Sequence, residues 1–170
     1  LFPKYETFAD FLSNTIIGKR KHTISEFFYR TQHIQQLGGY QIYPAGYYAD
    51  DASILLFCNN NGIASTEESL IVYRKSENNI SSSSCWNVEK SKAALKYYQW
   101  IIDEFPMKQQ DEQIIQQRLD FDLYTYFSAA LNIHQSIQIL NCIPVNIWNW
   151  KKKLLCLYKF ILNSYAKQIK

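Results

Sequence analysis

The sequence lacks the cysteine spacing of a structural zinc site. The four cysteines are Cys58, Cys85, Cys142 and Cys156, and no two of them form a Cys-x-x-Cys pair. Three of the four stand among apolar residues, which is typical of reduced thiols in the core of a cytosolic protein. The cysteines therefore indicate core packing and give no metal site.

Long apolar runs and a strong net charge are also missing. No apolar run reaches the roughly 20 residues that a membrane-spanning helix needs. The net charge of +3 is small for a nucleic-acid-binding protein, whose basic residues usually gather on one face. These absences argue against a transmembrane helix and against a nucleic-acid partner.

Aromatic residues, by contrast, are abundant. The 170 residues include 13 Tyr, 10 Phe and 4 Trp, and hydrophobic residues make up 47% of the sequence. A chain of this length and composition can bury the core of one ordinary domain. Tyrosine combines an apolar ring with a polar hydroxyl, so this aromatic load suits ring-stacking surfaces or wide helix interfaces.

The spacing of apolar residues divides the sequence into a mixed first half and a helical second half. The first half predicts a helix over 5–17, a strand over 23–30, helical turns over 31–37, a loop over 40–49, a helix from Asp50 to Cys58 and a strand over 70–73. The second half predicts helices over 93–102, 111–130, 133–140 and 148–165, the last of them basic and amphipathic. We therefore expect an α/β part over residues 1–84 and an all-helical extension over residues 85–170.

Two adjacent acids open the helix that runs to Cys58. Asp50 and Asp51 follow a loop that is rich in Gly, Pro and Tyr. Aspartate is a favoured N-cap, so capping is the simplest role for this pair. The position also suits a general base, because a helix N-terminus favours a negative charge and the helix gives the side chain a fixed support. The two roles are compatible, and the dipeptide alone favours capping.

A series of short motifs occurs in a fixed order between residues 25 and 81. They are Ser25 with Arg30, Gly38-Gly39-Tyr40, Asp50-Asp51, Gly62, Leu70 to Arg74, and Asn79 with Ser81. This order and spacing resembles the second half of the catalytic domain of family 2 glycosyltransferases, which are inverting, nucleotide-sugar-dependent enzymes of the GT-A fold. In that family a Gly-Gly-aromatic turn leads into a loop that faces the acceptor. An acidic pair then opens a helix, and its second acid is the usual general base.

The resemblance implies a bacterial enzyme that transfers a sugar from a nucleotide sugar to an acceptor hydroxyl, with inversion, during surface-polysaccharide biosynthesis. It implies an α/β fold, with the second half of a GT-A-like domain followed by helices. It gives the role of general base to Asp51 and that of supporting acid to Asp50. It further implies acceptor contacts at Gly39, Tyr40, Tyr47 and Tyr48, and diphosphate contacts at Arg74 and Lys75.

The metal-binding motifs of the family are largely missing from this sequence. Ser76 stands where many members carry a histidine that can bind the metal, and the Asp-x-Asp motif belongs before residue 1. We therefore expect Mg²⁺ or Mn²⁺ in the complete enzyme, with ligands mostly outside this chain, and expect the chain alone to be inactive. Asp120-Phe121-Asp122 has the Asp-x-Asp spelling, but it lies in a predicted helix and is interpreted as a solvated helix face or a cap.

The expected partners are a nucleotide sugar and a glycan or lipid-linked acceptor, without nucleic acid, in the cytoplasm. The basic segment 148–165 either packs its apolar stripe on the domain or contacts the acidic inner face of the membrane. The alternative function is a non-catalytic helical domain over residues 85–170 that binds a protein or a membrane.

Overall fold

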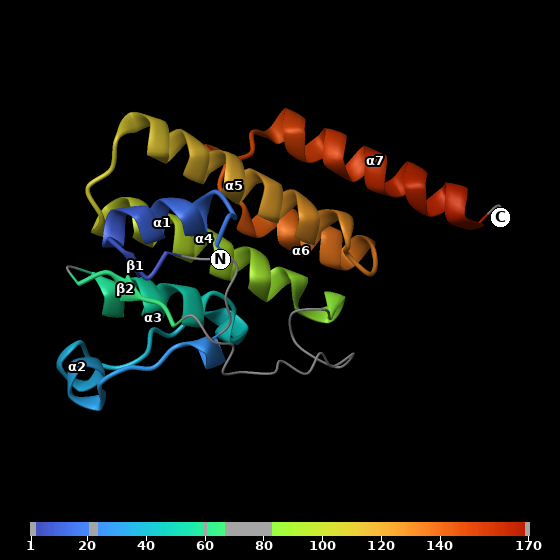
Figure 1. Ribbon diagram of the computed structural model, residues 1–170. Helices are drawn as coiled ribbons and strands as arrows, with labels where there is room; N and C mark the ends of the chain where they lie inside the picture. Colours follow the sequence, from blue (N-terminus) through green and yellow to red (C-terminus); the bar gives the residue numbers. More distant parts are fainter. Residues whose placement is uncertain (1–2, 21–23, 60, 67–82, 169–170) are drawn as a thin grey trace.

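The computed structural model describes residues 3–20, 24–59, 61–66 and 83–168, and these form a mostly helical protein (Figure 1). The α-helices are α1 (Phe8–Ile16), α2 (Thr31–Gln36), α3 (Ala49–Cys58), α4 (Asn87–Glu104), α5 (Gln109–Ser128), α6 (Ile133–Cys142) and α7 (Trp150–Gln168). Short 3₁₀ turns occur at η1 (Ile24–Glu26), η2 (Pro44–Gly46) and η3 (Ser84–Trp86). The described residues contain one small sheet, in which β1 (Tyr5–Glu6) pairs antiparallel with β2 (Ile63–Ala64).

The predicted helices are confirmed, with bounds that differ by a few residues, and the second half is all-helical as expected. The strand predicted over 23–30 is wrong over its described residues, because Ile24–Glu26 form a 3₁₀ turn and residues 27–30 pair with no strand. Phe27 and Tyr29 face inward while Phe28 is exposed, so buried and exposed side chains do alternate here as they would in a strand. It belongs to an extended segment that packs on the core through its rings. The strand predicted over 70–73 lies outside the described residues.

The N-terminal elements are fixed by a helix cap, a buried ion pair and a glycine. Thr7 caps α1, since its hydroxyl accepts a hydrogen bond from the Asp10 backbone N–H over 3.2 Å. Arg20 Nη1 lies 2.6 Å from Glu6 Oε2, and both side chains are almost fully buried. Gly62 has a φ of +68°, and a Cβ there would stand 2.2 Å from the Glu6 carbonyl oxygen. These contacts hold β1, β2 and the end of α1 together.

Helix α4 lies at the centre of the molecule and runs antiparallel to α5. The amide of Asn87, at the start of α4, donates to the carbonyl oxygens of Tyr126 and Ala129 at the end of α5, over 3.0 and 3.1 Å. Helix α6 packs on both α4 and α5, while α1 packs on α5 and α3. The hydrophobic core is continuous across residue 84, because Phe11 and Ile54 belong to the same buried cluster as Ile101 and Leu123.

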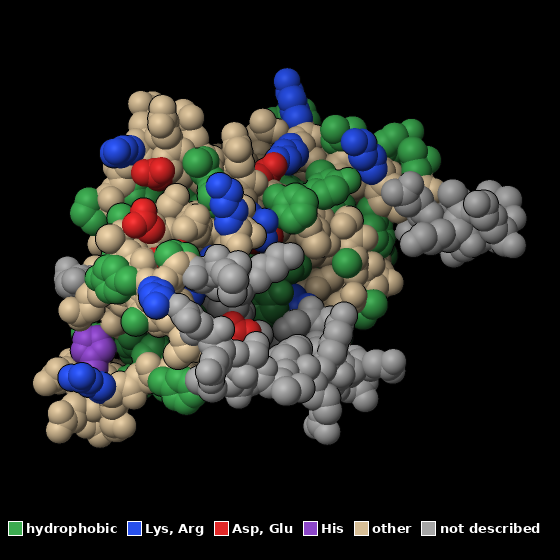
Figure 2. All heavy atoms as spheres, in the orientation of Figure 1, with side chains coloured by type: hydrophobic (Ala, Val, Ile, Leu, Met, Phe, Trp, Pro, Cys, Tyr) green, Lys and Arg blue, Asp and Glu red, His purple; other side chains and the backbone are tan. Residues whose placement is uncertain are grey.

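Helix α7 lies on the outside of this helical body and extends away from it toward the C-terminus (Figure 1). On the face shown in Figure 2, hydrophobic and lysine side chains lie side by side along α7. Over the residues that the structure describes, no helix combines the length and the apolar character needed to cross a membrane.

Candidate functional site

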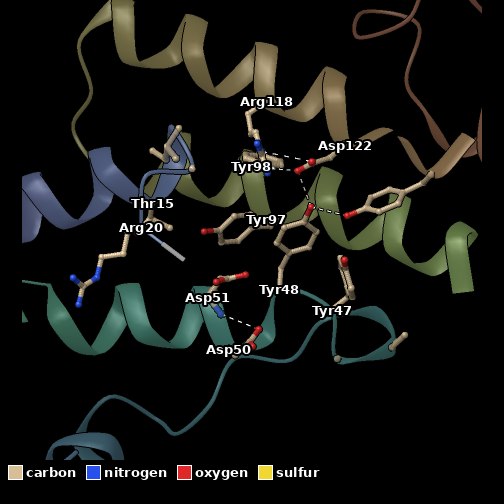
Figure 3. Close-up of a pocket in the computed structure, with 15 residues that line it drawn as sticks. Thr15, Arg20, Tyr47, Tyr48, Asp50, Asp51, Tyr97, Tyr98, Arg118 and Asp122 are labelled. Atoms are coloured by element: carbon tan, nitrogen blue, oxygen red, sulfur yellow. Dashed lines mark hydrogen bonds and ion pairs between the residues drawn. The ribbon is translucent and has the colours of Figure 1, made fainter. Parts of the chain in front are cut away.

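A cavity of about 700 Å³ lies between the first half of the chain and helices α4 and α5 (Figure 3). Its volume falls within the range of small-molecule binding sites. The lining comes from the end of α1, Arg20, the loop at η2, the first turn of α3, and α4 and α5. The lining side chains of interest are Tyr47, Tyr48, Asp50, Asp51, Tyr97, Tyr98, Arg118, Asp122 and Tyr126.

The loop that leads into α3 has an unusual backbone path beside this cavity. Ala45, Gly46 and Tyr48 all have positive φ, at 52°, 69° and 65°. Positive φ is costly for alanine and tyrosine, and such strain persists only where the surroundings enforce it. Pro44 begins the turn, and the Gly46 N–H donates to the Tyr43 carbonyl over 2.9 Å. The strain is therefore concentrated directly before the acidic pair.

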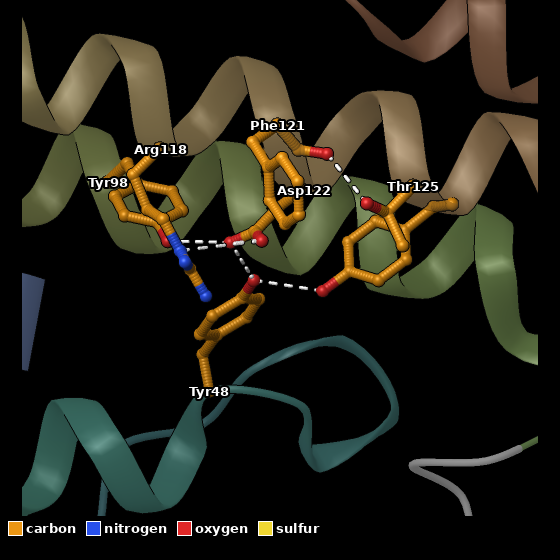
Figure 4. A network of polar contacts seen from close by, with 7 residues as sticks. Tyr48, Tyr98, Arg118, Phe121, Asp122 and Thr125 are labelled. Atoms are coloured by element: carbon orange, nitrogen blue, oxygen red, sulfur yellow. Dashed lines mark hydrogen bonds and ion pairs between the residues drawn. The ribbon is translucent and has the colours of Figure 1, made fainter. Parts of the chain in front are cut away.

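Tyr48 anchors this loop to the helical half through the buried carboxylate of Asp122 (Figure 4). The Tyr48 hydroxyl donates to Asp122 Oδ2 over 2.9 Å, and the Tyr98 hydroxyl donates to the same oxygen over 2.6 Å. Arg118 Nε lies 3.6 Å from Asp122 Oδ1. Because the single proton of Tyr48 is given to Asp122, the Tyr126 hydroxyl donates in its 2.9 Å contact with Tyr48. One carboxylate on α5 thus fixes the residue that precedes α3.

The acidic pair lies in the first turn of α3. The helix begins at Ala49 and Tyr48 is its N-cap, so the prediction that Asp50 or Asp51 caps it is wrong by two or three residues. Carboxylates remain favourable there, because the first backbone N–H groups of a helix lack helical partners. Asp50 Oδ1 accepts a hydrogen bond from the Asp51 backbone N–H over 3.0 Å.

The two acids of the pair point in different directions. Asp51 reaches from the first turn of α3 toward Tyr97 on α4, whereas Asp50 lies on the other side of the turn (Figure 3). Burial raises the pKa of Tyr97 well above 10.0, and the nearby charge of Asp51 raises it further. Both carboxylates line the cavity, and the charges of both raise the pKa of Tyr97, that of Asp51 more strongly.

The tyrosines of the cavity are held in their neutral form. Burial is the main cause that raises the pKa of Tyr48 and Tyr98 above 10.0, and it acts in the same way on Tyr126. The rings also pack on one another, since Tyr48 stacks on Tyr97 with centroids 4.8 Å apart. These groups therefore form a rigid wall of packed rings whose hydroxyl groups are engaged with one another and with Asp122.

The raised pKa values of these buried tyrosines predict that the protein unfolds at alkaline pH. A folded-state pKa above the unfolded value of 10.0 means that the unfolded chain ionises first, so the stabilisation is complete below pH 10 and falls as the pH rises beyond it. The buried tyrosines should ionise only when the helical circular dichroism signal is lost. Parallel titration of phenolate absorbance and circular dichroism checks this, and full ionisation with intact helices would contradict it.

The residues predicted to contact the acceptor are split between two places. Tyr47 and Tyr48 line the cavity. Gly39 and Tyr40 are not among its lining residues. Gly39 has a φ of 86° and follows the end of α2, where its N–H donates to the Ile34 carbonyl, and Tyr40 is half-exposed against the Phe57 ring. Arg74 and Lys75, predicted near the diphosphate, lie outside the described residues.

The interpretation of Asp120-Phe121-Asp122 as a solvated helix face or a cap is wrong for Asp122. That residue is buried and accepts hydrogen bonds from two tyrosines. Asp120 is partly exposed, and it pairs with the indole N–H of Trp148 and the ammonium group of Lys152. The position of Asp122 was readable from the sequence, since it lies three residues after Leu119 and four before Tyr126, within the apolar stripe of the helix.

The described residues bring together no set of three His, Cys, Asp or Glu side chains that could hold a metal ion. Asp50 and Asp51 are adjacent carboxylates on one turn, and Asp122 is engaged by Tyr48, Tyr98 and Arg118. These residues alone do not fit a complete cation site. Binding of Mg²⁺ or Mn²⁺ remains a prediction.

Comparisons with protein-family models, curated proteins and solved structures gave no match to this chain. The resemblance of residues 25–81 to family 2 glycosyltransferases therefore rests on their motifs alone.

Proposed function

We propose that this chain forms the acceptor side of an inverting, nucleotide-sugar-dependent glycosyltransferase of family 2, with the GT-A fold, acting in bacterial surface-polysaccharide biosynthesis. The observation that carries the proposal is the position of Asp51. The sequence motifs name this residue as the general base, and it lies in the first turn of α3, lining the cavity near Tyr97. Its place in the cavity lining supports the role that the resemblance implies for it.

The proposed reaction is a single displacement at the anomeric carbon. The acceptor hydroxyl attacks this carbon while Asp51 takes the hydroxyl proton. The new bond joins the acceptor oxygen to the anomeric carbon. The bond between that carbon and the diphosphate oxygen breaks, and its electron pair leaves with the nucleoside diphosphate. Attack from the face opposite the leaving group inverts the configuration.

The cavity supplies what this step requires of the acceptor side. A general base must be held within hydrogen-bond reach of the proton it removes, and a helix turn fixed by Tyr48 provides such a support. The partly buried rings of Tyr47 and Tyr48 offer apolar surface in the cavity against which a sugar ring can lie. Asp50 acts as the supporting acid, because it accepts the backbone N–H of Asp51.

Residues other than those of the cavity are proposed to bind the leaving diphosphate. Arg74 and Lys75 are proposed to meet its charge, and Mg²⁺ or Mn²⁺ would neutralise the diphosphate when bound in the complete enzyme.

The test is acceptor-dependent release of nucleoside diphosphate by the complete protein. A panel of uridine, guanosine and thymidine diphosphate sugars would be incubated with glycan and lipid-linked acceptors, and with no acceptor as the control. We expect one donor to be consumed only when an acceptor is present. Failure of every donor to be consumed, by a protein that binds none of the nucleotides, would contradict the proposal.

A second candidate role, the binding of a protein or a membrane by the helical half, is favoured by one observation. The side of α7 that faces away from the body is apolar. A binding function for the helical half can coexist with catalysis.

A further inference from the structure

Helix α7 is apolar on two opposite sides. Its inner side packs on the body, where Cys156 is buried and the Phe160 ring lies 5.9 Å from that of Phe127. Its outer side exposes large apolar residues at a spacing of three or four. Trp150 is 62% exposed, Leu154 56% and Tyr158 61%, and Ile161 continues the row. A second row, Leu155 and Leu162, widens this outer face, which is defined here as residues 150, 154, 155, 158, 161 and 162.

The start of α7 is fixed on the body, so the outer face is held outward. Trp148 is fully buried, and its indole N–H donates to Asp120 on α5. Lys152 pairs with the same carboxylate. The Lys153 ammonium group donates to the carbonyl oxygens of Leu140 and Ile143, at and just beyond the end of α6. Rotating α7 to bury its outer face would break all of these contacts.

The charge on α7 is entirely positive. The segment 150–168 carries Lys151, Lys152, Lys153, Lys159 and Lys167, and it contains no Asp or Glu. Lys151 and Lys159 are exposed beside the outer face, with Lys151 Nζ 5.8 Å from the Trp150 ring centroid. Figure 2 shows lysine and hydrophobic side chains interleaved there. Tryptophan and tyrosine favour the boundary between water and lipid.

From these observations we propose that the outer face of α7 docks on an anionic phospholipid surface, with the helix lying in the plane of the interface. Its apolar row would enter the headgroup region, and the lysines would meet the negative lipids. A second copy of this chain fits less well. Symmetric pairing through α7 would bring lysine-bearing helices together with no acid on either helix.

The experiment measures binding of the complete protein to vesicles of neutral phosphatidylcholine, and to vesicles in which phosphatidylserine replaces part of it. We expect strong preference for the anionic vesicles, lost as salt rises. Trp150→Ser combined with Leu154→Ser should weaken binding at least about tenfold, because two apolar side chains no longer enter the lipid. Lys151→Gln and Lys159→Gln should each weaken it roughly fivefold.

Matched controls change exposed residues elsewhere on the described surface. Phe28→Ser combined with Ile42→Ser removes two highly exposed apolar side chains, and Lys19→Gln with Lys92→Gln removes two exposed charges. Neither pair should alter vesicle binding. All variants are compared by circular dichroism and thermal unfolding, since substitutions on an exposed face should leave the midpoint unchanged.

Several results would overturn the proposal. The first is equal binding to both kinds of vesicle, and the second is binding that ignores the α7 variants. A marked fall in the thermal midpoint of the Trp150→Ser, Leu154→Ser variant would show that the face is packed within the complete protein. A dimer that the same variants dissociate, without vesicle binding, would assign the face to a second copy. None of these outcomes depends on catalysis.

Discussion

Replacement of Asp122 by alanine is expected to lower the free energy of unfolding by about 3 kcal/mol, since it leaves two buried phenol donors without their acceptor. Tyr48 and Tyr98 both donate to Asp122 Oδ2, and Arg118 lies beside Oδ1. The lost hydrogen bond of Tyr48 should contribute most to this change, because Tyr48 also has a positive φ that its surroundings must enforce. Denaturant unfolding followed by circular dichroism measures the change.

Two further variants sharpen this prediction. Asp122→Asn keeps the size of the side chain and one acceptor oxygen, so its free energy of unfolding should fall clearly less than that of the alanine variant. Asp103→Ala removes an exposed carboxylate that accepts from Gln99 on the same helix, and it should change stability by about 0.5 kcal/mol or less. If Asp122→Ala were as stable as Asp103→Ala, the carboxylate would not be the anchor of this loop.

Asp51→Asn in the complete protein is expected to lower the rate of sugar transfer by roughly 10² to 10⁴, the usual contribution of a general base. Asparagine has nearly the same shape and remains in the first turn of α3, so the fold and nucleotide binding should survive. The rate at saturating substrates and the dissociation constant of the nucleotide are the two quantities to measure.

The neighbouring acid gives the matched comparison. Asp50→Asn removes the same charge one residue earlier, where the side chain accepts the Asp51 backbone N–H and lies on the other side of the turn. Its effect on transfer should be much smaller, and Asp103→Asn should have none. Ordinary turnover by Asp51→Asn would refute its role as the base, whereas loss of nucleotide binding in that variant would indicate a structural defect.

Much of the helical architecture could be predicted from the spacing of apolar residues. The stripe through Ile115, Leu119, Leu123 and Phe127 is buried in α5, as the helical period requires. The prediction of a strand over 23–30 is wrong for its described residues, and the reason does not lie in the local sequence. Aromatic alternation at Phe27 and Tyr29 suits a strand, but a strand also needs a partner, and among the described residues this segment has none.

The site was only partly predictable for a similar reason. Asp51 could be named from its motif, but the αL conformation of Tyr48 depends on Asp122, which lies 74 residues further along the chain. A carboxylate within an apolar stripe signals a buried polar contact, yet the partner that satisfies it becomes known only when the helices are packed. Long-range polar contacts are set by tertiary structure, whereas periodicity is local.

The most direct measurement is the anomeric configuration of the product, determined by proton nuclear magnetic resonance after transfer by the complete protein. A single displacement assisted by Asp51 predicts inversion, so a donor whose sugar is α-linked to the diphosphate should give a β-linked product. An α-linked product would require two displacements or attack from the side of the leaving group. Either route would contradict the account of Asp51 as the base of a direct transfer.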